Sequence, residues 1–108
     1  MMTLLSDASP YAGPVTQWTF LTNHAHVLLC VAEIPDARVR EIAETVGITE
    51  RATQRILTEL EEAGYIEKTR DGRRNRYTLN PDMRMRHPMD QEHHIGELVG
   101  LLAKPVAG

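Results

Sequence analysis

The sequence predicts a mostly helical α+β domain, in which three helices and a β-hairpin are followed by a last helix. Apolar residues recur with helical spacing in four segments, and one segment alternates around an Asp-Gly turn. With 108 residues, 42% of them hydrophobic and 5% aromatic, the chain fits one domain with an aliphatic core. We divide it into a flexible arm (1–15), the main domain (16–82), and a linker with the last helix (83–108).

The functional prediction rests on residues 38–60. Apolar residues at i, i+3, i+4 and i+7 predict a helix here, and Gly47 suits the left-handed cap that would end it. Thr49 stands where a hydroxyl would cap a second helix, expected over residues 49–63. The inner face of this second helix would carry Thr53, Ile56, Leu57 and Leu60. Its outer face would carry Arg51, Gln54, Arg55 and Thr58.

A short helix, a turn with glycine and a helix with a basic outer face form the helix-turn-helix pattern. The second helix of such a pattern enters the DNA major groove. Two amphipathic helices of an ordinary helical domain would show the same spacing, so the segment that follows decides between the two readings.

Residues 65–79 predict a β-hairpin. Asp71-Gly72 suits a type I′ turn, which would place residues whose numbers sum to 143 opposite one another. Ile66 would then face Tyr77, and Glu67 would face Arg76. The tip carries Arg70, Arg73 and Arg74. Crowding arginines costs repulsion, so a phosphate or minor-groove contact explains them better than the alternative, a solvated charged turn.

The remaining segments complete the predicted domain. A first helix would run from a cap at Thr22 or Asn23 to about Glu33, and residues 38–40 could form a very short strand. Asp90 would cap a last helix that reaches about Ala103. Its apolar stripe consists of Ile95, Leu98, Val99 and Leu102. The stripe could cover its own domain or meet its copy across a two-fold axis, and we favour the dimer because so small a domain has little core left to cover.

Composition bounds the class of protein. The net charge is −3, but residues 68–86 hold seven basic residues against two acidic ones, as a localised phosphate contact needs. Cys30, the only cysteine, lies in an apolar run and is expected to be a buried small hydrophobe. Trp18 and Phe20 are expected to pack on the domain or on a partner subunit. The sequence shows no secretion signal and no membrane-spanning apolar run, so we expect a cytoplasmic protein.

The order of these elements resembles the winged helix-turn-helix regulators of bacteria, of the MarR and ArsR type. The resemblance covers about residues 22–79 and is most specific over residues 48–79. The family's spacing from the recognition-helix cap to the first wing strand is matched by Thr49, Arg55, Leu57, Leu60, Gly64, Tyr65 and Ile66. Unlike metal-sensing ArsR members, the chain has no cysteine cluster by the recognition helix.

The resemblance implies a homodimeric transcriptional regulator that binds a palindromic operator in double-stranded DNA. Helix 49–63 would enter the major groove, and wing 65–79 would contact the backbone or minor groove. By position, the DNA-binding residues would be Thr49, Arg51, Gln54, Arg55, Thr58, Arg70, Arg73, Arg74 and Arg76. Glu50 could accept from cytosine N4, but we prefer the reading in which it favours the helix N-terminus electrostatically.

Other functions have weaker support. A metal-responsive regulator could use Asp90, His93, His94 and Glu97 near the last helix, although a polar helix face explains them as well. A winged-helix module that binds protein is permitted by the acidic total charge, but the arginine-rich wing argues against it. The sequence has no nucleophile–base spacing, no glycine loop that would hold a phosphate and no pair of carboxylates that would form a cleft. We therefore expect that the chain is not an enzyme and binds no cofactor. Whether an effector is sensed cannot be read from the sequence.

Overall fold

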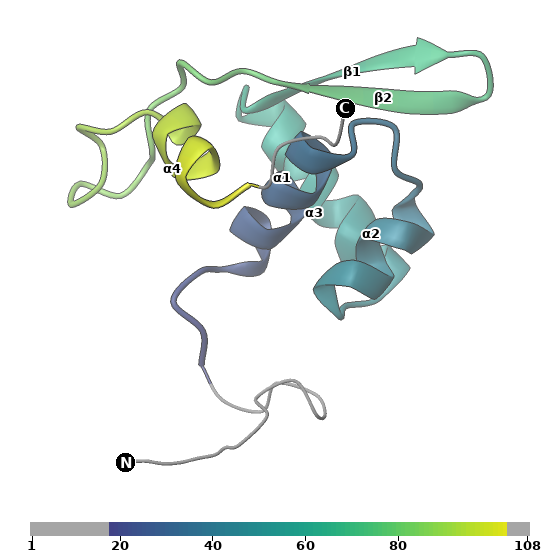
Figure 1. Cartoon of the computed structure of the whole chain (residues 1–108), viewed down its shortest axis with the longest axis horizontal. Coiled ribbons are helices and arrows are strands. Elements are labelled where there is room, and N and C mark those ends of the chain that lie inside the picture. Colours follow the sequence, from purple (N-terminus) through teal and green to yellow (C-terminus); the bar gives the residue numbers. More distant parts are fainter. Residues whose placement is uncertain (1–17, 104–108) are drawn as a thin grey trace.

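The computed structural model describes residues 18–103, so the arm expected over residues 1–15 lies outside the described residues. The elements are α1 (Asn23–Glu33), α2 (Val39–Val46), α3 (Glu50–Glu62), β1 (Ile66–Asp71), β2 (Arg74–Leu79) and α4 (Ile95–Leu102). The antiparallel hairpin lies above the helices, with α4 on one side of α1 and α2 on the other (Figure 1). This arrangement confirms the winged-helix fold, with a further helix after the wing.

The ends of the first three helices follow from local chemistry. At the starts of α1 and α3, the hydroxyl oxygens of Thr22 and Thr49 accept hydrogen bonds from the backbone three residues on, at 3.3 and 3.0 Å. Gly47 ends α2 with a φ of +88°, a left-handed conformation that glycine adopts without steric cost. The predicted boundaries of these helices are confirmed to within one or two residues.

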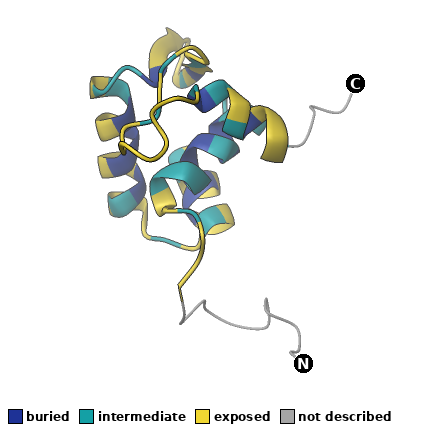
Figure 2. Cartoon of the chain, turned by 90° about the vertical axis from the view of Figure 1, so that its left-hand side faces the viewer, coloured by how far each residue is buried: buried dark blue, intermediate teal, exposed yellow. Residues whose placement is uncertain are grey.

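The core lies between α1, α2, α3 and the base of the hairpin. Its residues are aliphatic except for two tyrosines and Cys30, and they include Val27, Leu28, Val31, Ile42, Ile56, Leu57, Tyr65, Ile66 and Tyr77. Figure 2 shows the buried residues along the inner sides of the helices and the exposed residues along their outer sides. The predicted burial of Cys30 is confirmed, and desolvation raises the pKa of its thiol.

The predicted register of the hairpin was wrong. The numbers of facing residues sum to 145 instead of 143, because Gly72 and Arg73 form the turn and Asp71 still belongs to β1. Ile66 therefore faces Leu79, and Arg76 faces Thr69 instead of Glu67. The predicted register would have placed Arg70 opposite Arg73. The observed one places Asp71 opposite Arg74, and opposite charges across a strand pair are favourable where like charges are not.

The predicted strand over residues 38–40 is also absent, because Val39 already begins α2. A single backbone contact stands in its place. The N–H of Tyr77 in β2 donates to the carbonyl of Pro35 at 3.0 Å, so the loop between α1 and α2 lies beside the wing. The wing is thereby attached to the helical core along β2.

The last helix begins at Ile95 after a cap at His94, four residues later than expected from a cap at Asp90. Residues 83–85 and 93–95 run antiparallel, with Met85 N–H donating to His93 O at 3.0 Å and Ile95 N–H to Met83 O at 2.7 Å. Arg84 closes the intervening loop by donating to the carbonyls of Gln91 and Glu92 at 3.1 and 3.2 Å. This pairing holds His94 in an extended conformation, with φ −82° and ψ 150°, so the helix begins only after it.

The apolar stripe of α4 is divided between two surroundings. Ile95 and Val99 are buried in the core of the same chain, so this part of the stripe covers its own domain and is not the favoured dimer interface. Leu98 is partly buried and packs against the same core, whereas Leu102 and its neighbour Leu101, which lies outside the stripe, are exposed. Trp18 and Phe20 contact each other edge to face, with ring centroids 4.9 Å apart, but they are 76% and 91% exposed. They do not pack on the domain, so the alternative, packing on a partner subunit, stays a prediction.

Candidate nucleic-acid interface

The polar face of α3 is presented to solvent as the sequence predicted. Arg51, Gln54, Arg55 and Thr58 are all exposed, and the opposite face of the helix is buried. The one buried polar residue on that inner face, Thr53, donates from its hydroxyl to the carbonyl of Thr49 at 2.9 Å. The helix is thus fixed by its inner face, and its outer face is left available for recognition.

The side chains on this outer face differ in how firmly they are held. In the part of the chain that the structure describes, those of Arg51, Gln54 and Thr58 have no hydrogen-bond or ion-pair partner. Arg55 Nε lies 4.0 Å from Glu59 Oε2, one helical turn on, and Glu59 Oε1 lies 2.7 Å from Nε2 of His24 in α1. Exposed pairs of this kind contribute little stability, so Arg55 can exchange its partner at low cost.

The arginines of the wing differ in whether their side chains are held by other groups of the protein. Arg74 Nη1 lies 3.4 Å from Asp36 Oδ2 in the loop between α1 and α2. Arg70 Nε donates to the carbonyl of Gly72 at 3.0 Å and so folds back on its own turn. Arg73 in the turn and the side chain of Arg76 on β2 are exposed and have no partner among residues 18–103. Arg73 and Arg76 are therefore the wing cations most available to an anionic ligand.

The two polar residues at the start of α3 have structural roles. Thr49 caps the helix with its hydroxyl, as predicted. Glu50 is exposed in the first turn, where a carboxylate interacts favourably with the helix dipole. Neither role excludes a contact with a ligand.

The chemistry of this surface suits duplex DNA. A guanidinium can pair with O6 and N7 of guanine, and an amide with N6 and N7 of adenine, and both groups stand on one exposed helix face. A helix of this width fits the major groove, and cations on an adjacent hairpin can contact phosphates.

The residues considered for a metal do not converge. His93 Nδ1 lies 2.8 Å from Glu97 Oε1, and Glu97 Oε2 accepts from the backbone N–H of His94 at 2.9 Å, so Glu97 caps α4. Between residues 18 and 103, no group of three or more His, Cys, Asp or Glu side chains is placed to hold a metal ion. The hydrogen bond with Glu97 raises the pKa of His93, and the same bond lowers that of Glu97.

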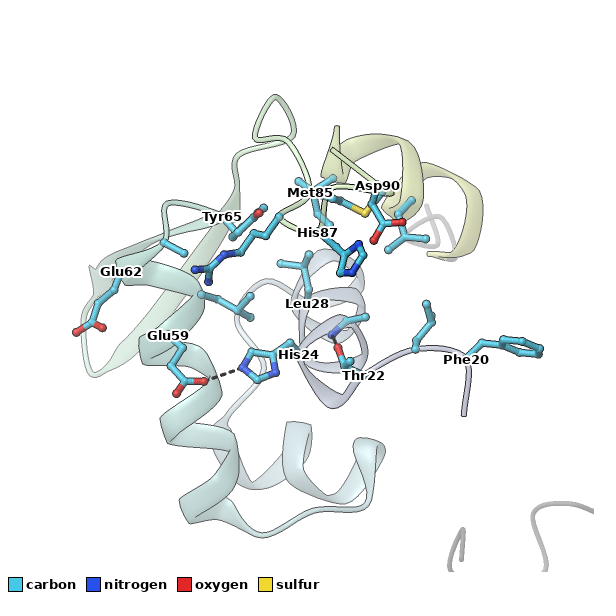
Figure 3. A pocket seen from close by; sticks show the side chains of 17 residues that line it. Phe20, Thr22, His24, Leu28, Glu59, Glu62, Tyr65, Met85, His87 and Asp90 are labelled. Carbon is cyan, nitrogen blue, oxygen red and sulfur yellow. Dashed lines mark hydrogen bonds and ion pairs between the residues drawn. The ribbon is translucent and has the colours of Figure 1, made fainter. Parts of the chain in front are cut away.

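A groove beside the second half of α3 could not be predicted, because its walls come from segments far apart in the sequence. It has a volume of about 860 Å³ and lies between α1, the second half of α3, the linker and α4 (Figure 3). Leu28, Leu60 and Ile95 give it apolar walls, and the His24–Glu59 pair closes one end. Phe20 lies at its rim.

Comparison with known proteins agrees with this architecture. A protein-family model described as MarR family matches residues 18–76, which is more than half of the chain. The match covers the three core helices and most of the wing, and it leaves out α4. No curated protein matches the chain. In the part of the chain that is described, no helix has the length and apolar character that a membrane span requires.

Proposed function

Because the chain belongs to the MarR family, whose members are DNA-binding transcription regulators and not enzymes, we propose that it regulates transcription as a sequence-specific homodimer. It binds a palindromic operator in double-stranded DNA, with α3 in the major groove and the wing on the backbone or minor groove. This activity belongs in the cytoplasm, where a bacterial regulator meets its DNA.

The observation that carries the proposal is the free outer face of α3. Arg51 and Gln54 are exposed and unpaired among the described residues, and they read base edges. Arg55 joins them after leaving Glu59, and Thr49 and Thr58 contact phosphates at the edge of the groove. The wing is positioned on the backbone by Arg70, Arg73, Arg74 and Arg76. Of these, Arg73 and Arg76 have no partner among the described residues to release before they bind.

The exposed apolar side chains support a dimer. Leu101 and Leu102 on α4 and the pair Trp18–Phe20 are large apolar side chains exposed to water, and a second copy would cover them. A two-fold dimer would place two recognition helices about 34–36 Å apart, one turn of DNA, and would require a palindromic site.

The test is binding of the purified protein to genomic fragments, including its own upstream region, at two salt concentrations. We expect one fragment to bind about a thousandfold more tightly than random duplex. Arg51→Ala/Arg55→Ala should remove this preference, since each bidentate arginine contributes about 1–3 kcal/mol of discrimination. Arg40→Ala/Arg86→Ala is the matched control, because it removes the same charge from positions outside α3 and the wing.

The other outcomes separate the alternatives. Uniform binding to all fragments would contradict sequence-specific regulation and leave the arginines as general phosphate contacts. A wild-type protein that binds no duplex at either salt concentration would favour a protein-interaction module. In that module, Arg73→Ala/Arg74→Ala would leave partner binding intact.

The effector left open by the sequence has a candidate site in the groove beside α4. Its apolar walls at Leu28, Leu60 and Ile95 suit a small molecule with an apolar body. Such a ligand would touch α1, α3 and α4 together, and it would change the affinity for the operator to the extent that it binds the DNA-bound and DNA-free arrangements of these helices unequally, which the same assay measures.

A further inference from the structure

We propose that the hollow between the wing and the loop preceding α2 binds one phosphate group of the DNA backbone through Arg38, Arg73 and Arg74. This inference rests on the proposed function and adds to it a phosphate site away from the base-reading face of α3. It also adds Arg38, a residue that the sequence pattern did not select, to the DNA-binding surface.

The hollow is built by two segments far apart in the sequence. It has a volume of about 350 Å³, enough for a phosphate group and its water, and is lined by residues 36–39 on one side and by residues 73–75 and Tyr77 on the other. The hydrogen bond from Tyr77 N–H to the carbonyl of Pro35, at 3.0 Å, holds the two sides together. The hollow is therefore part of the folded architecture and not a gap between independent segments.

The residues that line the hollow carry a net positive charge in a chain that is acidic in total. Three arginines line it, and the one carboxylate among its lining residues, Asp36, lies 3.4 Å from Arg74. The side chains of Arg38 and Arg73 are exposed and have no ion-pair partner within residues 18–103. Two of the three guanidinium groups are therefore left uncompensated by the protein.

The donors for a ligand are these side chains, not the N-terminus of α2. Glu41 Oε1 already accepts the backbone N–H of Arg38, the N-cap residue, at 2.7 Å, so a carboxylate occupies that end of the helix. Guanidinium groups match the oxygens of a phosphate with two parallel hydrogen bonds, and they repel one another unless an anion lies between them. A phosphate is the ligand that this arrangement fits.

The position of the hollow favours the DNA backbone over a free phosphate. It lies between the helix-turn-helix unit and the wing, the two elements that contact DNA in the proposed function. A phosphodiester held there would lie between a major-groove contact by α3 and the contact made by the wing. Arg74, already held at the hollow by Asp36, would need little reordering.

The experiment compares Arg38→Ala with Arg40→Ala. Arg40 is an equally charged, exposed residue of α2 that does not line the hollow, so it is a matched control. We expect Arg38→Ala to weaken binding to every duplex by a similar factor and to reduce the slope of log K against log salt by about 0.9. The ratio of the wild-type association constant to that of this variant should then fall about 3.5-fold between 50 and 200 mM salt. Arg40→Ala should keep the wild-type slope.

The possible failures are distinguishable. If the wild type binds its operator but Arg38→Ala and Arg40→Ala have equal slopes, this inference is wrong and the proposed function stands. If the wild type binds no DNA, both are wrong. Titration of inorganic phosphate into the DNA-free protein, followed by NMR, tests whether the hollow binds free phosphate instead. Saturable phosphate binding that Arg38→Ala removes, together with an unchanged slope of log K for DNA against log salt, would overturn the assignment to the DNA backbone. Equal thermal unfolding of both variants shows that they are folded.

Discussion

At the scale of single residues, the pair His93–Glu97 makes the start of α4 sensitive to pH. The hydrogen bond between the two side chains raises the pKa of His93 above 6.5 and lowers the pKa of Glu97 below 4.5. A raised histidine pKa adds stability below about pH 6.5, which is lost as the pH rises through the raised value. A lowered carboxyl pKa adds stability above about pH 4.5, which is lost as the pH falls through the lowered value.

The pair should therefore stabilise the fold most between these two ordinary values. We expect His93→Gln to lower the urea midpoint most near pH 5.5, and the variant and wild type to converge once the pH exceeds the raised pKa of His93. Glu97 still caps His94 in this variant, so the comparison isolates the pair. A midpoint difference that stays constant from pH 5 to pH 8 would show that the pair does not titrate with folding.

Neighbouring arginines in this chain have unlike surroundings. Arg84 binds two backbone carbonyls of its own loop, and Arg74 faces Asp36, whereas Arg73 has no partner in the described structure. The cluster of basic residues could be predicted from the sequence because it is a matter of composition. Which of them are free could not, because the carbonyls and the carboxylate that bind them come from other segments.

At the scale of secondary structure elements, local patterns predicted what local chemistry determines. The two faces of α3 and the threonine caps follow from spacing within one helix, and they are confirmed. The register of the hairpin depends on which residue of Asp71-Gly72-Arg73 begins the turn. Gly72 takes the first turn position with a φ of +64°, and the facing pair Asp71–Arg74 is formed only in that register. The sequence allowed both positions for the turn.

The residue at which α4 starts is determined by contacts with the preceding linker, and the spacing of apolar residues along the helix carries no information about these contacts. The chain between Met83 and Met85 pairs with the segment before the helix, and Pro81 lies against Gly96 in its first turn. Gly96 N–H also donates to the carbonyl of Pro81 at 3.0 Å. The linker therefore fixes where the helix begins and how it sits on α1.

Gly96 provides a test of this docking. A Cβ added there would lie 2.7 Å from Pro81 Cβ and 2.9 Å from the Pro81 carbonyl oxygen, closer than van der Waals contact permits. We expect Gly96→Ala to destabilise the protein by about 1–3 kcal/mol in urea denaturation, because backbone must move to admit the methyl group. In Gly100→Ala, by contrast, the Cβ meets nothing within 4 Å, and helix propensity should add up to about 1 kcal/mol. Equal effects of the two substitutions would contradict the close approach of Pro81.

At the scale of the whole molecule, charge and apolar surface are both unevenly distributed. The chain has a net charge of −3, yet Arg38, Arg73 and Arg74 gather where the wing meets the loop before α2. This uneven distribution reconciles an acidic protein with a DNA-binding family, because phosphate contacts respond to local charge. Tertiary contacts, not the sequence pattern, bring Arg38 to the wing.

The exposed apolar residues lead to the last prediction, which concerns the dimer. Ile95 and Val99 are used by the core of their own chain, so the stripe of α4 cannot be the interface in the form that the sequence suggested. The residues that remain for a partner on this helix are Leu101, which is 79% exposed, and Leu102. We expect the wild type to have the mass of a dimer in light scattering at micromolar concentration.

Leu101→Glu should then give a monomer, because a carboxylate at the centre of an apolar interface loses its water without gaining a partner. Met89→Glu is the matched control: Met89 is 86% exposed but lies in the linker before α4, so this variant should stay dimeric. Without its partner, the monomer would engage only one half of a palindrome, so Leu101→Glu should also weaken operator binding. Its unfolding by urea should not depend on protein concentration, whereas that of a dimeric wild type should. A wild type that is monomeric at concentrations where it occupies its operator would instead show that one copy of α3 and one wing suffice for recognition.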